Sequence, residues 1–292
     1  MNRLTREWGL FALFVAPNLL LLAAFTYWPL IFNLYLSLTE WNMISPDKDF
    51  VGLENYRDLA GDPAFWRIFG NTFYFVGIGV AASLVIALGT ALLLNQKLRA
   101  RGFARAVVFA PTILTGSAIA IVWIYVFDPN YGLMRVFLNG AGLVSPRWLT
   151  DPPYAMPALL IVYVWKNFGY AVVIYLAGLQ SISKELYEAA VVDGASSWDR
   201  FLAVTLPGLS PITFFLFVTS ILGSFQAFDI VAVMTSGGPV DATNTLIYNL
   251  YEEGFVAFRA GRAAAIGIVL FVLMLAVTVV QLRAVERRVH YA

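Results

Sequence analysis

Apolar runs long enough to cross a bilayer recur along the whole chain, and they constrain its fold more than any other feature. A helix needs about 20 apolar residues to cross a hydrocarbon core of about 30 Å, because each residue adds about 1.5 Å. The segments that meet this length are 10–36, 69–94, 106–127, 154–180, 208–234 and 263–283. Only 13% of the residues are charged, about half of the usual fraction in soluble domains. We therefore expect an all-α, polytopic membrane protein with six transmembrane helices.

The basic residues between these spans predict the orientation. Eleven Lys and Arg residues fall on the side that holds both termini, and seven fall on the other side. The contrast is sharpest in residues 95–105, which carry four basic residues, including Lys97, and no acid. Loops rich in Lys and Arg stay in the cytoplasm, so we expect both termini to be cytoplasmic. The expected parts are an N-terminal span with the first external loop (1–68), a core membrane domain (69–283) with a cytoplasmic loop at 181–207, and a cytoplasmic tail (284–292).

The composition excludes several kinds of chemistry. The chain has no cysteine and a single histidine, His290 in the tail, which removes disulfides, thiolate catalysis and most metal sites. It contains no G-x-x-x-x-G-K-[ST] sequence, so it has no loop of this type to hold ATP phosphates. The net charge of +1 gives no reason to expect a nucleic-acid partner. We expect no catalytic residue, no metal ligand and no cofactor in this chain.

The loop between the fourth and fifth spans carries helix signals of its own. Residues 184–192 favour a helix that Ser183 would cap and Gly194 would end. A second short helix is expected from about Ser197, and Pro207 marks the approach to the fifth span. Two short amphipathic helices would then lie on the cytoplasmic face. For a membrane protein in general, an interfacial elbow that only returns the chain to the bilayer is the better explanation of such a loop, and only its residue order favours a docking role.

The residue order of this loop resembles the EAA loop of permease subunits in bacterial ABC importers. The matching segments are Glu188-Ala189-Ala190, Asp193-Gly194-Ala195, Phe201, Leu206-Pro207 and Pro211. The resemblance implies a coupling helix that docks in a groove of an ATPase subunit. Small alanines would allow close approach, and Gly194 would allow a sharp bend. The residues expected to couple the chain to the ATPase are Glu185, Glu188, Ala189, Ala190, Asp193, Gly194, Ala195, Leu206 and Pro207.

The resemblance extends over most of the chain. Residues 228–255, 50–56 and 164–166 are similar to carbohydrate-uptake permeases of the maltose and glycerol-3-phosphate type, and the last third resembles the glycerol-3-phosphate members in particular. This implies a type I ABC-importer permease in the bacterial inner or plasma membrane, in contact with lipid. The implied partners are a homologous second permease, two ATP-binding subunits that hold ATP and Mg²⁺, and an extracytoplasmic solute-binding protein. The implied solute is glycerol-3-phosphate, a glycerophosphodiester or a sugar.

Polar side chains inside the fourth and fifth spans are the candidates for a solute pathway, because such groups usually face the interior of a bundle. The candidates are Tyr163, Lys166, Asn167, Tyr170, Gln226 and Asp229. The four in the fourth span share one helical stripe. Aromatic rings can stack on sugar faces while amides and acids bind hydroxyls, and Lys166 can hold a phosphate as a point charge. An alternative is that Lys166 only pairs with Asp229 and joins two helices.

Two other classes of function compete with the importer. A stand-alone secondary transporter would need carboxylates near the midplane to bind coupling ions, and Asp229 is the only acid that the predicted spans offer. A membrane-embedded enzyme would need a nucleophile or a metal constellation, for which the sequence offers no candidates. The chain cannot hydrolyse ATP itself, so an importer of this kind depends on a partner subunit for its energy.

Overall fold

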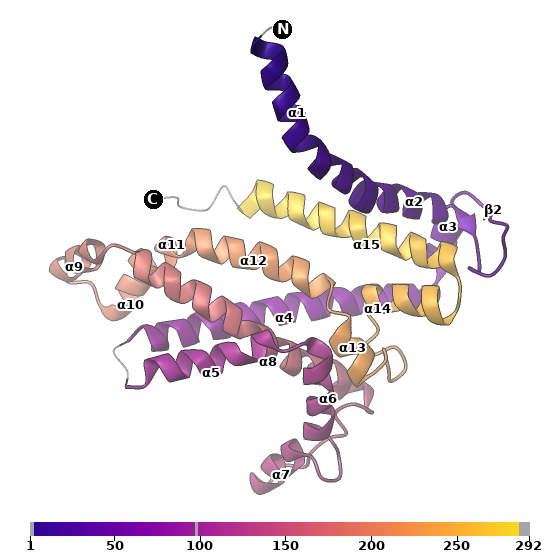
Figure 1. The fold of residues 1–292 in the computed structure, drawn as a ribbon. Helices are drawn as coiled ribbons and strands as arrows, with labels where there is room; N and C mark the ends of the chain where they lie inside the picture. The colour runs from indigo at the N-terminus through magenta and orange to yellow at the C-terminus, as the bar shows by residue number, and fades with distance from the viewer. Residues whose placement is uncertain (1–2, 97–98, 286–292) are drawn as a thin grey trace. The chain divides into compact units, whose positions relative to one another are not determined.

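The computed structural model describes residues 3–96 and 99–285, with side chains for 11–96 and 99–283. Within these ranges the chain is helical apart from two strands of two residues each (Figure 1). It divides into two compact units: residues up to Asp62 with Leu250–Phe271, and Pro63–Asn249 with the residues from Val272 on. The expected division into an N-terminal part (1–68), a core membrane domain (69–283) and a tail (284–292) stays a prediction. Lys97, His290 and the tail from residue 286 lie outside the described residues.

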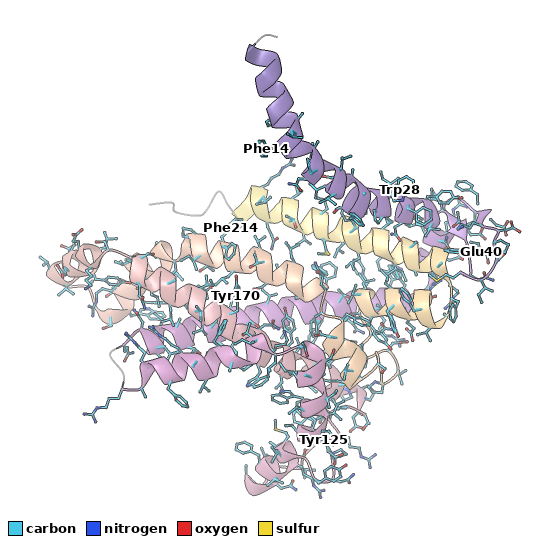
Figure 2. All side chains as sticks on the ribbon, in the orientation of Figure 1. Phe14, Trp28, Glu40, Tyr125, Tyr170 and Phe214 are labelled. Carbon is cyan, nitrogen blue, oxygen red and sulfur yellow. The ribbon has the colours of Figure 1, made fainter. Side chains whose placement is uncertain are left out.

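The first unit combines the N-terminal helices, a short hairpin and the start of the last long helix. Its elements are α1 (Arg3–Leu22), a π-helical turn (Ala23–Tyr27), α2 (Trp28–Leu36), β1 (Thr39–Glu40), β2 (Asp49–Phe50), α3 (Glu54–Gly61), the end of α14 (Leu246–Tyr251), a π-helical turn (Glu252–Val256) and most of α15 (Ala260–Val280). The two strands are antiparallel, with Thr39 opposite Phe50. Phe14 and Trp28 are among the apolar side chains exposed along the first helices (Figure 2).

Polar contacts hold the segment after the first span in place. The Asn55 amide donates hydrogen bonds to the carbonyl oxygens of Ser37 and Thr39, both at 3.0 Å. The backbone N–H of Ala260, at the start of α15, donates to the carbonyl oxygen of Trp41 at 2.9 Å. Because these bonds satisfy backbone groups that have no helical partner, the hairpin and α3 form an ordered cap on the start of α15.

The second unit contains the remaining elements. They are α4 (Pro63–Asn95), α5 (Arg101–Ile113), α6 (Gly116–Val126), α7 (Leu133–Gly140), α8 (Pro152–Ser181), α9 (Lys184–Val192), α10 (Ser197–Arg200), a π-helical turn (Phe201–Thr205), α11 (Leu206–Gly208), α12 (Ser210–Phe225), α13 (Asp229–Met234) and a last π-helical turn (Gln281–Val285). The core forms where α4, α6, α8 and α13 meet, around buried Phe75, Ile119, Leu159 and Ile230.

The packing of α5 on α8 depends on one glycine. A Cβ atom at Gly169 would lie 2.2 Å from the carbonyl oxygen of Val108, so only glycine lets the two backbones approach this closely. Beside this contact the Thr112 hydroxyl donates a hydrogen bond to the carbonyl oxygen of Lys166 at 3.1 Å. The backbones of α5 and α8 therefore lie close together at Gly169, about one helical turn from Lys166.

The expected number of membrane spans agrees with the structure when two bent helix pairs are each counted as one span. Four helices are long and apolar enough to cross a bilayer alone: Phe11–Leu36, Pro63–Asn95, Pro152–Ser181 and Ala260–Arg283. The other two candidates are Arg101–Ile113 with Gly116–Val126, bent by 103°, and Ser197–Gly208 with Ser210–Phe225, bent by 61°. The all-α, polytopic fold is confirmed, whereas the cytoplasmic position of both termini stays a prediction.

The prediction of one continuous helix was wrong for two of the spans. The segment 106–127 breaks after Ile113, because Pro111 lies in the last turn of α5 and Thr115 caps a new helix, accepting from the N–H of Ala118. The segment 208–234 breaks after Phe225, and α13 starts at Asp229, whose carboxylate accepts the N–H of Ile230 at 3.0 Å. The second span also begins earlier than residue 69, at Pro63, since proline is favoured at the first position of a helix.

Candidate functional site

The predicted coupling loop folds as two short helical arms, and the first arm is α9. Its bounds are those expected, and the Ser183 hydroxyl oxygen accepts the N–H of Glu185 at 3.2 Å. The same hydroxyl donates to the Glu185 carboxylate at 3.1 Å. Glu185 lies in the first turn of α9, where the helix dipole favours an acid. The first predicted coupling residue therefore helps to start the helix.

The end of α9 is a Schellman turn built on Gly194. Gly194 has φ of +77°, a left-handed conformation that favours glycine. The N–H of Ala195 donates to the carbonyl oxygen of Ala190 at 2.9 Å, and the N–H of Gly194 donates to that of Val191 at 3.0 Å. Four of the predicted coupling residues, Ala190, Asp193, Gly194 and Ala195, thus form the turn that sets the direction of the chain after α9.

The second arm begins with a capping box. The Ser196 hydroxyl oxygen accepts the N–H of Asp199 at 3.2 Å, and the Asp199 carboxylate accepts the N–H of Ser196 at 3.0 Å. The Ser196 hydroxyl also donates to this carboxylate, and this bond and the backbone N–H together hold the pKa of Asp199 below its usual value. The arm then runs through α10 and a π-helical turn to Leu206 and Pro207 in α11.

One hydrogen bond joins the two arms. The hydroxyl groups of Tyr187 in α9 and Thr205 in the second arm lie 2.9 Å apart. Thr205 is buried and Tyr187 is partly exposed, so the bond is partly buried. Trp198 and Phe201 also stack, with ring centroids 5.3 Å apart. The loop is therefore braced across its own turn, although its two arms are separated by residues 193–196.

This loop exposes several large apolar side chains. Leu186, Val192 and Trp198 are exposed, with Val192 at 87%. Glu188, Ala189 and Asp193 are also exposed, and within the described part of the chain the Glu188 carboxylate makes no hydrogen bond or ion pair. Exposed apolar groups gathered in one place are typical of protein interfaces. The docking role of the nine coupling residues stays a prediction.

A cavity of about 270 Å³ lies in the second unit, where five elements meet. Its lining residues come from α4, α5, α8, α12 and the segment that leads into α13: Val80, Ser83, Thr112, Tyr163, Lys166, Asn167, Tyr170, Ala171, Thr219, Ser220, Gly223, Gln226, Ala227, Asp229 and Ile230. All six residues predicted for the solute pathway are in this lining. The break between α12 and α13 brings Gln226 and Asp229 to it. The structure thus brings the predicted residues together, and their role in binding stays a prediction.

The prediction missed the hydroxyl groups that α4, α5 and α12 supply. Ser83, Thr112 and Thr219 line the cavity, but small hydroxyl residues are common in membrane helices and gave no signal in the sequence. Ser83 is 4% exposed, and its hydroxyl has no hydrogen-bond partner among the described residues. A buried polar group without a partner is costly, so Ser83 is available to a ligand in this cavity.

The predicted residues of α8 differ in their surroundings. Tyr163 is buried, and its ring meets that of Phe75 edge to face at a centroid distance of 5.0 Å, so it packs the core as well as lining the cavity. Tyr170 is 40% exposed (Figure 2). The Asn167 amide donates to the carbonyl oxygen of Tyr163 at 2.8 Å. Tyr170 is therefore better placed than Tyr163 to stack on a solute.

Lys166 and Asp229 line the same cavity without forming an ion pair. The ion pairs of Arg259 and Arg262 lie in the other unit, and none within 4.0 Å joins the described side chains of Lys166 and Asp229. The carboxylate of Asp229 instead lies against Gly116, at the start of α6. The alternative was that Lys166 only pairs with Asp229 and joins two helices. No contact in this conformation supports it.

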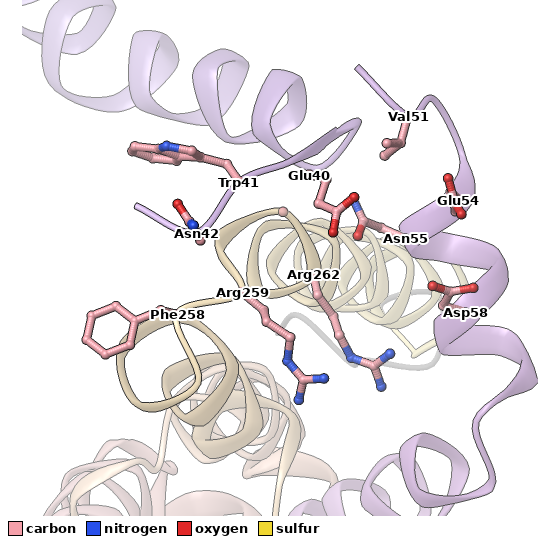
Figure 3. Close-up of a pocket in the computed structure, with 11 residues that line it drawn as sticks. Glu40, Trp41, Asn42, Val51, Glu54, Asn55, Asp58, Phe258, Arg259 and Arg262 are labelled. Atoms are coloured by element: carbon pink, nitrogen blue, oxygen red, sulfur yellow. The ribbon is translucent and has the colours of Figure 1, made fainter. Parts of the chain in front are cut away.

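A second cavity, of about 240 Å³, lies within the first unit (Figure 3). Arg259 and Arg262 extend side by side from the start of α15 (Figure 3). Arg259 pairs with Glu253 at 2.7 Å, and Arg262 pairs with Glu253 at 3.2 Å and with Asp62 at 2.5 Å. Because the Glu253 side chain is only 8% exposed, this network fixes the end of α3 to the start of α15. None of the predicted site residues lies in it.

Comparison with known proteins identifies the family. Residues 79–291 match the family described as the binding-protein-dependent transport system inner membrane component. The sn-glycerol-3-phosphate transport system permease protein UgpA of Pectobacterium atrosepticum is 35% identical over 95% of this chain and 94% of its own. A probable ABC transporter permease of Pyrococcus horikoshii is 36% identical over 91% of each chain. The chain belongs to this family of inner membrane components.

A solved structure supports the fold independently. The membrane chain of a bacterial ABC transporter that imports the acidic polysaccharide alginate aligns over 97% of this chain and 96% of its own, with a TM-score of 0.81 and 24% identity. Its family membership makes the chain the non-catalytic, multi-pass inner membrane subunit of an ABC transporter, and this membership implies a solute-binding protein and an ATPase as partners. This membership replaces the competing hypotheses of a stand-alone secondary transporter and a membrane enzyme.

Proposed function

We propose that this chain forms half of the translocation pathway of a carbohydrate-type ABC importer. The proposed solute is glycerol-3-phosphate, a glycerophosphodiester or a sugar, as suggested by the UgpA relatives and by the alginate importer. The observation that carries the proposal is the cavity in the second unit, which gathers all six predicted pathway residues from two separate spans. Pathways in transporters are built in this way, around broken helices near the midplane.

The proposed partners are a homologous second permease, two ATP-binding subunits and an extracytoplasmic binding protein, all within membrane lipid. ATP and Mg²⁺ would be held by the ATP-binding subunits. The coupling loop supports the ATPase contact, because it exposes Leu186, Val192 and Trp198 as well as the carboxylate of Glu188. Exposed apolar side chains and a free carboxylate suit a groove that supplies one basic or amide partner.

The hydrogen bond that braces the loop suggests how a movement of the ATPase subunits would be passed on to the cavity. When the ATPase subunits close on ATP, each docked loop would move with them. The Tyr187–Thr205 hydrogen bond and the turn at Gly194 make the loop move as one piece, rather than bend. Its second arm runs into α12, and α12 supplies Thr219 and Ser220 to the cavity. A rigid-body shift of this kind alternates access from one side to the other.

The test separates the cavity from the loop in the fully assembled, reconstituted transporter. Lys166→Ala and Gln226→Ala should lower ATP-driven uptake about tenfold, the effect of losing one hydrogen bond to a charged or polar group, while the ATPase still co-purifies. Glu188→Lys should instead abolish ATPase binding, and ATP-driven uptake should be lost with it. Glu54→Gln, an exposed change in the first unit, serves as the control. Unchanged uptake in both cavity variants would refute the proposed pathway.

A further inference from the structure

The cavity in the second unit has nearly balanced charge. Among the described residues, its lining holds one amino group, that of Lys166, and one carboxyl group, that of Asp229. A cavity that recognises a phosphate ester would be expected to carry an excess of positive charge, because the phosphate brings up to two negative charges. Whether the cavity can bind a phosphate ester therefore depends on where the Asp229 carboxylate lies.

Asp229 occupies the start of α6. A Cβ atom at Gly116 would lie 1.7 Å from Oδ2 and 2.4 Å from Cγ of Asp229, so the carboxylate fills the space that a side chain at position 116 would need. Gly116 is the first residue of α6, which has 11 residues. Figure 1 shows α13, which begins at Asp229, next to α6. A residue with a side chain at position 116 would therefore force the Asp229 carboxylate to move.

The start of a helix is where transport proteins and enzymes often hold an anion. The first backbone N–H groups of a helix have no partner within it, and the helix dipole is positive at this end. Such a site readily accepts a phosphate or carboxylate group of a ligand. In this chain the Asp229 carboxylate lies against Gly116, the first residue of α6, and it accepts a hydrogen bond from the N–H of Ile230 in its own helix. A solute phosphate that approached this helix start would meet the negative charge of Asp229.

The rest of the lining suits hydroxyl groups. It offers the hydroxyls of Ser83, Thr112, Thr219 and Ser220 and the amides of Asn167 and Gln226, with the exposed ring of Tyr170. The Ser83 hydroxyl is buried and has no partner among the described residues, so it is available to a solute hydroxyl. Groups that both donate and accept match the hydroxyls of a polyol or sugar better than a phosphate, which mainly accepts.

We propose that Asp229 is a specificity-determining residue, which excludes anionic solutes from the cavity and tunes it to uncharged, polyhydroxylated ones. The inference rests on the proposed function, since it assumes that solute passes through this cavity. Of the solutes named under the proposed function, a sugar or polyol then fits the cavity, and glycerol-3-phosphate and glycerophosphodiesters do not. Lys166 then balances Asp229 and binds solute oxygen, instead of holding a phosphate.

The experiment measures binding of inorganic phosphate to the complete transporter in lipid nanodiscs. Wild type should bind phosphate weakly. Asp229→Asn removes the charge and keeps the shape, and Asp229→Ala also vacates the start of α6, so phosphate should bind about tenfold tighter or more, a change of about 1.4 kcal/mol. Adding Lys166→Ala to either variant should abolish the gain. Asp58→Asn, the same change at an exposed acid of α3, should behave as wild type.

Two results would overturn the inference: wild type binds phosphate as tightly as the Asp229 variants, or none of the variants gains phosphate binding. Asp229→Asn keeps the test valid if Asp229→Ala fails to fold. Tight binding of sn-glycerol-3-phosphate by the cognate binding protein would also overturn it. A failure of the proposed function is a different observation, namely that uptake is unaffected by Lys166→Ala and Gln226→Ala. A gain of phosphate binding can be seen whether or not uptake responds.

Discussion

The coupling loop and the cavity differ in how they are built. The hydrogen bonds that cap and brace the loop join residues within 183–205, from the Ser183 cap to the Tyr187–Thr205 hydrogen bond. The cavity instead gathers residues from Val80 to Ile230, which come from five elements. A local structure depends on residues close in sequence, whereas the cavity depends on how distant helices pack.

This difference predicts how each region responds to damage. A change in the loop should stay in the loop, because few contacts tie it to the rest of its unit. A change at a helix contact beneath the cavity should disturb several lining residues together, since interiors are close-packed and transmit strain. The following substitutions test this contrast, starting with the one that should cost most.

Gly169→Leu should have the largest effect. Its Cβ would lie 2.2 Å from the carbonyl oxygen of Val108, which belongs to backbone and cannot turn away. Overpacking of this kind costs about 1–3 kcal/mol or more, and it would separate α5 from α8 beside Lys166. The expected result is loss of thermal stability in detergent together with loss of solute binding. Gly77→Leu, in α4, meets no atom within 4 Å and is the matched control. Equal stability of the two variants would contradict a cavity that depends on this contact.

The same contrast explains what could be predicted from the sequence. The bounds of α9, its Ser183 cap and the turn at Gly194 were all anticipated, because capping and glycine signals act over a few residues. The six pathway candidates were found because polar groups stand out in apolar spans. The hydroxyls of Ser83 and Thr112 were missed, since nothing local distinguishes a lining serine or threonine from a packing one.

The breaks in the third and fifth spans show a further limit. The hydropathy of 106–127 and 208–234 shows that both segments are apolar. It does not show that one helix ends near Pro111 and that Thr115 caps the next. The close approach of Asp229 to Gly116 is a tertiary contact, which no pattern along the chain could indicate. The feature that most affects the expected solute was therefore the one least visible in the sequence.

Gly194→Val should affect the loop alone. A Cβ atom at Gly194 would meet nothing within 4 Å, so the cost comes only from its φ of +77°, about 1–2 kcal/mol for a residue with a side chain. We expect the turn after α9 to change and ATPase activity to lose its stimulation by the binding protein, while solute binding in the cavity is kept. Gly194→Asn is the matched control, because asparagine tolerates left-handed backbone. Loss of function in both variants would point to a contact made by the glycine instead of its conformation.

Ser196→Ala should have the smallest effect. It removes the cap of α10, which costs about 1 kcal/mol, or about a fivefold increase in local opening. Hydrogen exchange in the assembled complex should show faster exchange at residues 197–200 and unchanged exchange in α8. The Ser196 bonds lower the pKa of Asp199, so the stabilising effect of its carboxylate is present above the unfolded pKa of about 4 and is lost only as pH falls below it. The cap should therefore be insensitive to pH between about 5 and 8. A change in exchange around the cavity, or a pH response within that range, would show that the loop and the cavity are less independent than their contacts indicate.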